Sequence, residues 1–184
     1  LTSFLFYKDD IRKHGSHNAG LTNFYRVYGG KFAVCVILVD MLKAFVAVKL
    51  GSVVFDAYLG LRLEGEYFSA LFCVIGHIFP AFYSFKGGKG IATTFGCLLG
   101  LLPFWTPVLV LACIFIFYST ILRITPNLSR TRVTYFTLPL GMLLMEVPLW
   151  ICFGTLCMTG MVLVRLHIST EEREKAAVHL LWWT

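Results

Sequence analysis

Hydrophobic residues fall into long blocks along this chain, and short polar segments separate the blocks. Blocks such as 104–122 are apolar on nearly every helical face, whereas a helix of a soluble protein has one apolar stripe. A helix of about 20 apolar residues can cross a bilayer. The pattern predicts helices at about 32–50, 67–84, 91–103, 107–123, 133–147 and 148–166. The third is short for a span, and Pro103 and Pro107 mark the turn after it.

Residues 1–7 resemble the last turns of a further helix, so we expect an incomplete N-terminal helix. The whole pattern predicts an all-α fold, a polytopic integral membrane helix bundle of about six transmembrane helices plus this truncated one. Several helices are expected to be short or re-entrant, and a single domain is expected to cover residues 1–184. Composition agrees, because 58% of the residues are hydrophobic and only 14% are charged, and the mean hydropathy is +0.76.

The distribution of lysine and arginine predicts the orientation in the membrane. If the polar segments alternate sides, thirteen basic residues lie on one side and two, Lys49 and Arg62, on the other. The basic side is then expected to face the cytoplasm. The polar segments 9–26, 76–96 and 165–175 all fall on that side, where they could build a single site. The thirteen are Lys8, Arg12, Lys13, Arg26, Lys31, Lys86, Lys89, Arg123, Arg130, Arg132, Arg165, Arg173 and Lys175.

Charge and cysteine spacing argue against a nucleic acid partner, a metal site and disulfide bonds. The net charge of +6 could suggest nucleic acid, but the basic residues are scattered at the ends of apolar blocks, so no nucleic acid partner is expected. The six cysteines lie inside apolar blocks without a CxxC pair. We therefore expect them to be packing residues, with no metal and no disulfide.

Residues 76–96, GHIFPAFYSFKGGKGIATTFG, place a glycine-rich cationic turn between two apolar blocks. Gly87, Gly88 and Gly90 let the backbone approach a ligand closely, and the amides that open the next helix lack helical partners. With Lys86 and Lys89 beside them, these groups favour a phosphate. The alternative is a plain turn between helices, which would not need two lysines and three glycines.

The turn is not a Walker A loop, because Tyr83 stands where that motif needs its first glycine and Gly90 replaces its serine or threonine. A nucleotide hydrolase is therefore disfavoured. A second polar segment, DDIRKHGSHNAGLTNFYR at 9–26, carries groups that coordinate phosphate oxygens, namely Ser16, Asn18, Thr22, Asn23 and Arg26, around Gly15 and Gly20. The alternative here is a solvated interfacial loop with helix caps.

Two further groups of residues are weaker candidates. Asp40 and Lys43 lie three residues apart within an apolar block, so they share one helix face and are expected to form a structural ion pair. Arg165, His167 and Arg173 lie near the C-terminal end of the last block. A histidine at a helix end is usually a cap or an interface residue. A catalytic or binding role for His167 therefore requires that it lie close to the other two polar segments.

These segments resemble the bacterial acyl-phosphate:glycerol-3-phosphate acyltransferases, the PlsY family. Residues 10–26 follow the pattern DIRKHGSxNxGxTNxxR, and residues 76–96 match GHxFPxFxxFKGGKGxATxxG throughout. Asp40 and Lys43 match the family's LDxxKG helix, with Val39 and Ala44 in place of its leucine and glycine. His17 stands where the first motif usually has glycine. In the third motif, HxxNIxRLxxGxE, His167 and Arg173 align but Thr170 and Glu171 replace asparagine and isoleucine.

The resemblance implies transfer of a fatty acyl group from acyl phosphate to the sn-1 hydroxyl of glycerol 3-phosphate, which gives lysophosphatidic acid and phosphate. It implies a multi-pass protein of the bacterial inner membrane, in contact with lipid, whose active site faces the cytoplasm. An enzyme that makes acyl phosphate is a possible partner. No cofactor and no metal are expected. The sequence has no GxSxG elbow and no HxxxxD pair, so direct attack without an acyl-enzyme is expected.

Roles follow from the resemblance, residue by residue. Phosphoryl oxygens are expected to bind Ser16, Arg26 and Lys89, with His167 as a further partner. The amides of Gly87, Gly88 and Gly90 are expected to stabilise the leaving phosphate or the developing oxyanion. His77 is expected to be a base or, preferably, a structural hydrogen-bonding residue. Asn18, Thr22 and Asn23 are expected to position glycerol 3-phosphate or to brace the loop. The remaining substrate-binding candidates are Gly15, Lys86 and Arg173.

Two other functions remain open from the sequence. A transporter of small organic phosphates would want a cationic site near the bilayer midplane and internal repeats, but the cations lie at one face and no repeat is visible. A catalytically silent binder of organic phosphates or membrane partners is the third possibility, which the altered third motif leaves open.

Overall fold

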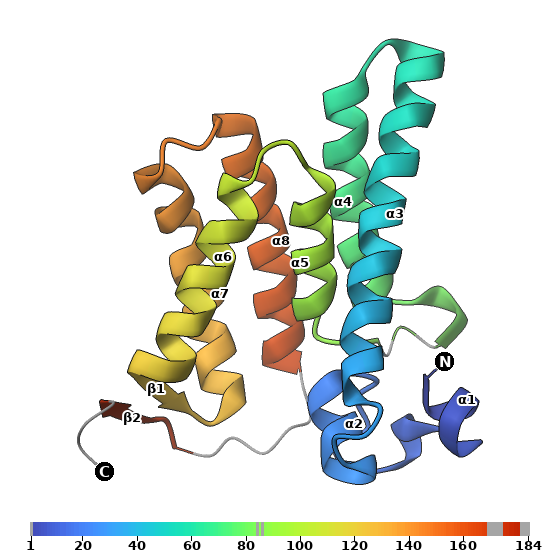
Figure 1. The fold of residues 1–184 in the computed structure, drawn as a ribbon, viewed down its shortest axis with the longest axis vertical. Helices are drawn as coiled ribbons and strands as arrows, with labels where there is room; N and C mark the ends of the chain where they lie inside the picture. The colour runs from blue at the N-terminus through green and yellow to red at the C-terminus, as the bar shows by residue number, and fades with distance from the viewer. Residues whose placement is uncertain (1, 84, 86, 169–174, 181–184) are drawn as a thin grey trace. The chain divides into compact units, whose positions relative to one another are not determined.

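The computed structural model describes residues 2–83, 85, 87–168 and 175–180, and these are mostly helical (Figure 1). The α-helices are α1 (Thr2–Tyr7), α2 (Leu21–Tyr28), α3 (Ala33–Leu59), α4 (Arg62–Ile78), α5 (Ile91–Gly100), α6 (Thr106–Ile116), α7 (Asn127–Leu144) and α8 (Leu149–Ile168). Short 3-10 helices η1 (Ile11–Lys13) and η2 (Ala81–Tyr83) and a π-helical segment η3 (Phe117–Ile121) connect them. The strands are β1 (Leu122–Thr125) and β2 (Ala177–Leu180).

Each expected helix has a counterpart, but the boundary between the first two was predicted wrongly. Residues 51–66, which fall between the predicted helices 32–50 and 67–84, are helical except for Gly60 and Leu61. α3 runs to Leu59, where Gly60 ends it in the left-handed conformation at φ 67°. Gly51 does not break the helix, because it serves helix packing. A Cβ on Gly51 would lie 1.6 Å from Oγ of Ser69 on α4, so only glycine allows the two helices to approach this closely.

The expectation of an all-α fold needs one correction. β1 pairs antiparallel with β2, with Leu122 opposite Leu180 and Thr125 opposite Ala177. The β1 sequence LRIT contains two β-branched residues directly after the π-helical segment. β-branched side chains favour extended backbone. The backbone amides and carbonyls of β1 find their partners in β2, a segment distant in the sequence. The local hydrophobic pattern could not predict this pairing.

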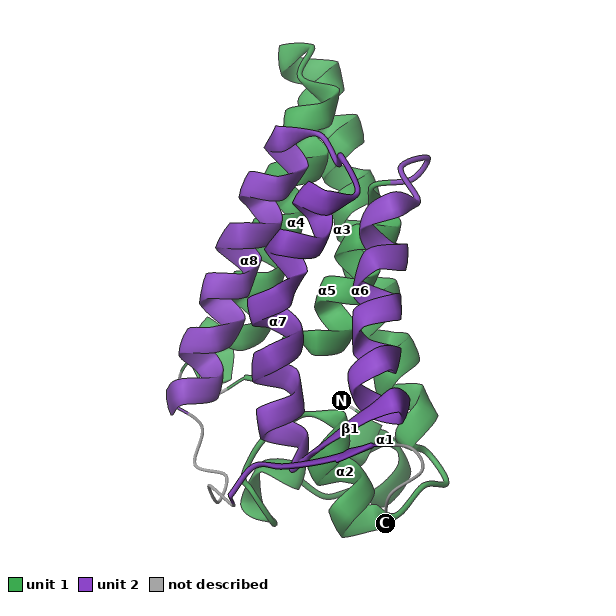
Figure 2. Cartoon of the chain, turned by 90° about the vertical axis from the view of Figure 1, so that its left-hand side faces the viewer, with its two compact units in different colours: residues 1–101 green, residues 102–184 purple. Residues whose placement is uncertain are grey.

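The chain divides into two compact units, residues 1–101 and residues 102–184, which Figure 2 shows in different colours. In the first unit α3 packs against both α4 and α5. A Cβ on Gly96 would lie 2.2 Å from the carbonyl oxygen of Met41, and one on Gly100 would lie 2.6 Å from Cβ of Val48. The Gly96–Gly100 spacing therefore lets α5 lie directly on the backbone of α3. Completely buried Ala44, Val48, Ala70, Val74, Ile78, Cys97 and Leu98 form the core.

In the second unit α7 packs against α6 and α8. Its core contains Leu111, Tyr135, Leu138, Met142, Val162 and Leu166, all with no exposed surface. Threonine hydroxyls on α7 donate to carbonyl oxygens one turn earlier, as Thr134 does to Arg130 at 2.9 Å. This back-bonding satisfies hydroxyls that would otherwise be unpaired in an apolar environment. All six cysteines lie among the described residues and are free thiols.

Many large apolar side chains lie on the outside of the helices, which is unusual for a protein in water. On α3, Leu38, Leu42, Leu50 and Val53 are each about 60% exposed. Within the described residues, the stretches Arg62–Tyr83 and Leu149–Ile168 are long and apolar enough to cross a membrane. A surface of this kind suits lipid rather than water.

Candidate functional site

The segment 9–26 folds around one buried side chain, Asn23 of α2, which is 1% exposed. Its Nδ2 donates to the carbonyl oxygens of Ile11 at 3.2 Å, His14 at 2.9 Å and Asn18 at 3.0 Å. Its Oδ1 accepts from the amide of Ser16 at 2.9 Å. Since these bonds engage the whole amide group, Asn23 braces the loop, which is one of the two roles expected for it.

The backbone of this loop has a positive φ at two positions, Gly15 and His17. Gly15 has φ +58°, and a Cβ there would lie 2.3 Å from Oδ1 of Asn23. Gly15 is therefore required by the fold, whatever its relation to a ligand. His17 has φ +55°, a conformation that favours glycine, and glycine is the residue usual at this place in the resembled family. Nδ1 of His17 lies 2.9 Å from the carbonyl oxygen of Arg12, a contact that holds the ring on the loop.

Asp10 and Arg12 form a bidentate ion pair at the start of the same segment. Nε of Arg12 donates to Oδ1 of Asp10 at 2.9 Å, and Nη2 donates to Oδ2 at 2.7 Å. These bonds lower the pKa of Asp10 to about 2, and the same pairing raises the pKa of Arg12. The guanidinium of Arg12 also lies over the ring of Tyr83, 4.2 Å from its centroid. The pair therefore links the first polar segment to η2, in the second segment.

A second acidic residue anchors α2. Oη of Tyr28 donates to Oδ2 of Asp9 at 2.7 Å, and Nε2 of His14 lies 2.9 Å from the same oxygen. The hydrogen bond from Tyr28 lowers the pKa of Asp9. Burial, followed by the bond to Asp9, raises the pKa of Tyr28 to about 12. These contacts are structural and hold the loop against the end of α2.

The glycine turn is built differently from the expectation. The amide of Gly87 donates to the carbonyl oxygen of Ile78 at 3.1 Å, and that of Gly88 donates to the carbonyl oxygen of His77 at 3.2 Å. The prediction that these two amides face a substrate is therefore wrong, because they close the turn onto the C-terminal end of α4, whose carbonyls lack helical partners. Gly90, at φ +87°, is the N-cap of α5, and Oγ1 of Thr94 donates to its carbonyl oxygen at 2.9 Å.

Lys89 lies within this turn and is only 7% exposed. A buried ammonium group is stable only where negative charge or hydrogen-bond acceptors surround it. This burial distinguishes Lys89 from the lysines of the solvated loops, such as the exposed Lys13. Lys86 lies outside the described residues.

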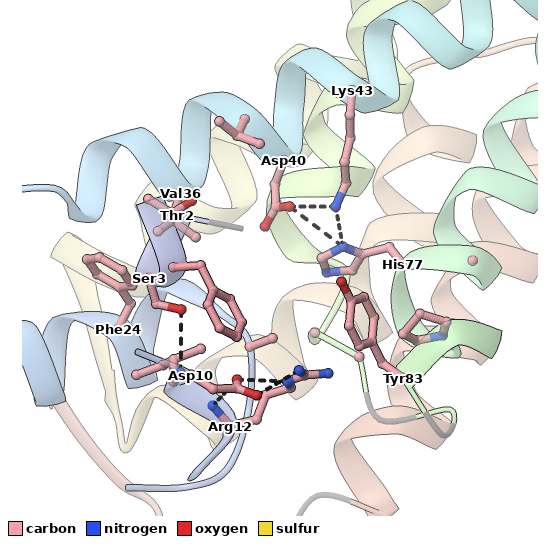
Figure 3. A pocket seen from close by; sticks show the side chains of 18 residues that line it. Thr2, Ser3, Asp10, Arg12, Phe24, Val36, Asp40, Lys43, His77 and Tyr83 are labelled. Atoms are coloured by element: carbon pink, nitrogen blue, oxygen red, sulfur yellow. Dashed lines mark hydrogen bonds and ion pairs between the residues drawn. The ribbon is translucent and has the colours of Figure 1, made fainter. Parts of the chain in front are cut away.

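A pocket of about 280 Å³ connects the two polar segments within the first unit (Figure 3). The first segment contributes Asp10, Ile11, Arg12 and Ala19, and the second contributes Gly76, His77, Pro80, Tyr83, Gly87 and Gly88. The remaining lining comes from α1, α2 and α3, as Thr2, Ser3, Phe4, Phe24, Val36, Val39, Asp40 and Lys43. The pocket therefore has an apolar wall and a wall of charged and imidazole groups.

Asp40 and Lys43 meet His77 at this charged wall. Nζ of Lys43 lies 2.6 Å from Oδ1 of Asp40 and 2.7 Å from Nδ1 of His77. The expected ion pair between α3 residues is confirmed, and it also contacts the helix that leads into the glycine turn. Figure 3 shows the three side chains converging from α3 and α4.

The other predicted residues of the first segment do not line the pocket. Asn18 is 4% exposed, and its Oδ1 has no hydrogen-bond partner within the described part of the chain. Ser16 is half-buried, and Arg26 is exposed on α2. Thr22 lies in the first turn of the same helix.

The third predicted segment belongs to the second unit. His167 lies in the last turn of α8, where Nη2 of Arg132 donates to the carbonyl oxygen of Leu166 at 3.1 Å. Arg173 and Thr170 lie outside the described residues. Among the described residues, no group of three His, Cys, Asp or Glu side chains could hold a metal ion.

Among the pocket residues that sequence reasoning missed, Asp10, Arg12 and Tyr83 make the contact between the two polar segments. Asp10 and Arg12 stand inside the first motif, so their charge in a phosphate-binding segment was an available signal. Tyr83 occupies a position that the second motif leaves unspecified, and only its ring contact with Arg12 identifies it.

Two crystal structures resemble this chain in fold. Both are of PlsY (YgiH), described as an integral membrane glycerol 3-phosphate acyltransferase. The glycerol 3-phosphate form matches with a TM-score of 0.70 and 25% identity over 90% of this chain and 80% of the other. The lysophosphatidic acid form matches with a TM-score of 0.65 and 26% identity over 82% and 73%. This likeness, the apolar exterior and the stretches long enough to span a bilayer identify the chain as a helical integral membrane protein.

The family model for glycerol-3-phosphate acyltransferase matches residues 1–174, and the chain belongs to this family. Relatives named glycerol-3-phosphate acyltransferase include one from Finegoldia magna, 46% identical over 65% of this chain and 56% of the relative. One from Pseudomonas fluorescens is 39% identical over 76% and 70%, and one from Streptococcus thermophilus is 37% identical over 71% and 56%. The match spans little more than half the length of the Finegoldia and Streptococcus relatives.

Proposed function

We propose that this chain transfers a fatty acyl group from acyl phosphate to the sn-1 hydroxyl of glycerol 3-phosphate. The observation that carries the proposal is the pocket that the two family motifs line together, with Arg12, Lys43 and His77 in its wall. Two phosphorylated reactants need such a concentration of cationic and hydrogen-bonding groups. Membership of the family and the glycerol 3-phosphate and lysophosphatidic acid forms of the similar structures support the same chemistry.

The reaction needs no protein nucleophile. The hydroxyl oxygen of glycerol 3-phosphate attacks the acyl carbonyl carbon, an ester bond forms, and the bond from the acyl carbon to the phosphate oxygen breaks. The hydroxyl proton passes to a phosphate oxygen, so the products are lysophosphatidic acid and inorganic phosphate. Acyl phosphate is already activated, so the protein contributes orientation and neutralisation of charge.

We assign the residues of the first unit as follows. Ser16, Arg26 and the buried Lys89 are not among the pocket-lining residues, but they belong to the two motifs that line the pocket. We assign to them the binding of phosphoryl oxygens, and the amide of Gly90 at the start of α5 adds a donor. The buried Oδ1 of Asn18, which lacks a partner within the described residues, accepts a hydroxyl of the glycerol group. A contribution of His167 or Arg173 stays a prediction.

The surroundings of the site are also proposed. The apolar exterior of the helices contacts lipid, and acyl phosphate reaches the pocket from the membrane. The excess of basic residues on one side supports a cytoplasmic orientation of the pocket. An enzyme that supplies acyl phosphate is the partner that this chemistry requires.

The decisive experiment supplies two acyl donors to the purified protein in lipid. Labelled glycerol 3-phosphate is offered with palmitoyl phosphate and, separately, with palmitoyl-CoA. We expect 1-acyl lysophosphatidic acid from palmitoyl phosphate only, and the position of the ester is read by comparison with both regioisomers. Product from palmitoyl-CoA alone would refute the proposed donor, and the 2-acyl isomer would refute the proposed position.

Two variants connect the activity with the site. Lys89→Ala is expected to reduce turnover at least a hundredfold, because it removes a buried positive charge at the turn. Lys13→Ala, at an exposed lysine, is the matched control and is expected to keep normal turnover. A transporter would instead accumulate labelled glycerol 3-phosphate in sealed vesicles without forming product.

A further inference from the structure

A short segment after α4 carries two phenylalanines that the fold leaves uncovered. Phe82 is 96% exposed and Phe85 is 63% exposed, and neither lines the pocket. Two large apolar rings in such positions are unfavourable in water, because removing a phenylalanine side chain from water is strongly favourable. Neighbouring exposed apolar side chains indicate a contact with something outside the chain.

Backbone hydrogen bonds fix the segment that carries the two rings. The amides of Tyr83 and Phe85 both donate to the carbonyl oxygen of Pro80, each at 3.1 Å. The base of the segment is closed by the amide of Gly87, which donates to the carbonyl oxygen of Ile78 at 3.1 Å. The exposed rings are therefore carried by a closed turn whose backbone is held at both its tip and its base.

The backbone conformation of Phe85 points in the same direction. Phe85 has φ +59°, a left-handed conformation that is costly for a bulky side chain and that glycine adopts freely. The ring gains little from the chain in return, because most of it is exposed. A side chain that is unfavourable both in its backbone and in water needs a favourable contact elsewhere.

The position of the segment indicates that this contact is lipid. Phe82 is the second-last residue of the stretch Arg62–Tyr83, which is long and apolar enough to cross a membrane. A stretch that crosses a bilayer ends at its surface, where aromatic side chains are enriched. Phe68 and Phe72 on α4 are 43% and 65% exposed, so the apolar exterior of this stretch continues to the turn. Figure 1 shows the segment projecting sideways from the lower end of α4.

Tyr83, which stands between the two phenylalanines, belongs to the pocket instead. Figure 3 shows its side chain among those that line the pocket, and the guanidinium of Arg12 lies 4.2 Å from its ring centroid. One short turn thus has a side chain at the candidate site and two side chains on the outside. The depth at which the two phenylalanines are held in a bilayer therefore also sets the depth of this part of the pocket wall.

We propose that Phe82 and Phe85 form a membrane anchor, whose rings insert among the lipids at the bilayer surface and hold the glycine turn there. A second part of the inference rests on the proposed function. The anchor places the pocket at the depth of the phosphate group of a membrane-embedded acyl phosphate, and it thereby favours the uptake of this substrate. Glycerol 3-phosphate is soluble in water, so its binding does not depend on the anchor.

Photocrosslinking identifies what covers the two rings. The photoreactive residue p-benzoylphenylalanine keeps the aromatic ring and is placed at position 82 or 85 of the full chain in the membranes of the host cell. After irradiation, the adducts are identified by mass. The same residue at Leu42, which is 63% exposed on α3, is the control for lipid. At Lys13, which is exposed in the first polar segment, it is the control for water.

The yield of phospholipid adducts decides whether the anchor exists. We expect a yield at positions 82 and 85 similar to that at position 42, and at least about fivefold above that at position 13. A yield no higher than that at position 13 would overturn the anchor. Adducts with a second copy of this chain or with another protein, in place of lipid, would overturn it as well.

Kinetics test whether the anchor serves the uptake of the acyl donor. Phe82→Ser is expected to raise the KM for palmitoyl phosphate in vesicles about tenfold, because the inserted ring is lost, and to leave kcat and the KM for glycerol 3-phosphate unchanged. Phe82→Trp keeps an aromatic ring that suits the bilayer surface and should restore the natural KM. The matched control is Phe72→Ser, which removes an exposed ring from α4 away from the turn.

Two kinetic outcomes would contradict the uptake role. Equal KM values for palmitoyl phosphate in Phe82→Ser and Phe72→Ser would show that the position of the ring at the turn does not matter. An equal rise of the KM for both substrates would show that Phe82 supports the fold of the turn and not the uptake of the acyl donor.

Failure of the proposed function gives a different result. A protein without acyltransferase activity toward palmitoyl phosphate would refute the function, while the crosslinked products would still decide whether Phe82 and Phe85 contact lipid. Phospholipid adducts at both positions, together with an unchanged KM in Phe82→Ser, would refute the uptake part of the inference alone.

Discussion

The guanidinium of Arg12 lies 4.2 Å from the centroid of the Tyr83 ring, and this contact joins two segments that are far apart in the sequence. Arg12 is held in place by its bidentate bond to Asp10, and Tyr83 ends η2. Both side chains line the same pocket. The two polar segments are thus connected by a cation–π contact at the wall of the candidate site.

Tyr83→Leu should loosen this connection. Loss of the ring face should cost about 0.5–1 kcal/mol, since the tyrosine is about half exposed, and it should raise the KM for the phosphorylated substrates more than it lowers kcat. Tyr83→Phe keeps the ring and serves as the control. Thermal unfolding in detergent and steady-state kinetics provide the two measurements, and equal behaviour of the Leu and Phe variants would contradict the role of the ring.

The ion pair of Asp10 should make stability depend on pH in the acid range. The pKa of Asp10 is about 2 in the folded chain and about 4 in an unfolded one. Its contribution, about 1 kcal/mol for a partly exposed pair, is therefore present above pH ~4 and is lost as the pH falls toward the folded value.

Asp10→Asn isolates this contribution, because the other carboxyl groups are unchanged. We expect the variant to have a lower Tm than the natural chain at neutral pH, and the difference should shrink as the pH is lowered through the range from about 4 to about 2. The measurement is the Tm in detergent across this range. Parallel curves would show that Asp10 does not gain stability from Arg12.

Asn23 should be among the most sensitive positions of the first segment. Asn23→Ala leaves three carbonyl oxygens and the amide of Ser16 without their partner, so we expect a loss of about 2–4 kcal/mol of stability. Asn23→Asp should be no better, because a carboxylate would face three carbonyl oxygens. The exposed Tyr25 on the same helix gives the control Tyr25→Ala, and similar Tm values for the two alanine variants would refute the bracing role.

Gly88→Ala should disturb the turn through the imidazole. The added methyl group would lie 2.2 Å from Nε2 of His77, so the ring has to leave Gly88, and we expect kcat to fall about tenfold or more. Gly160→Ala is the control, because nothing lies within 4 Å of a Cβ at that helical glycine. Normal turnover of Gly88→Ala would mean that the placement of the His77 ring does not matter.

The helices could be predicted because their signal is local. Apolar blocks of sufficient length gave each of the expected helices, and the motifs identified the segments that line the pocket. The extent of α3 could not be predicted, because Gly51 is kept in the helix by its contact with Ser69 on α4. The pairing of β1 with β2 depends equally on a distant partner.

The sequence by itself determined the helical membrane class and the residue types of the site, since hydrophobic length and motif chemistry are properties of neighbouring residues. Only the tertiary structure decided how those residues are used. In the folded chain the Gly87 and Gly88 amides bond to carbonyl oxygens at the end of α4, the side chain of Asn23 bonds to the backbone of the loop, and Nζ of Lys43 contacts Nδ1 of His77. The physical reason is that each donor can serve either the fold or a ligand, and the choice depends on which acceptors the folded chain brings within about 3 Å.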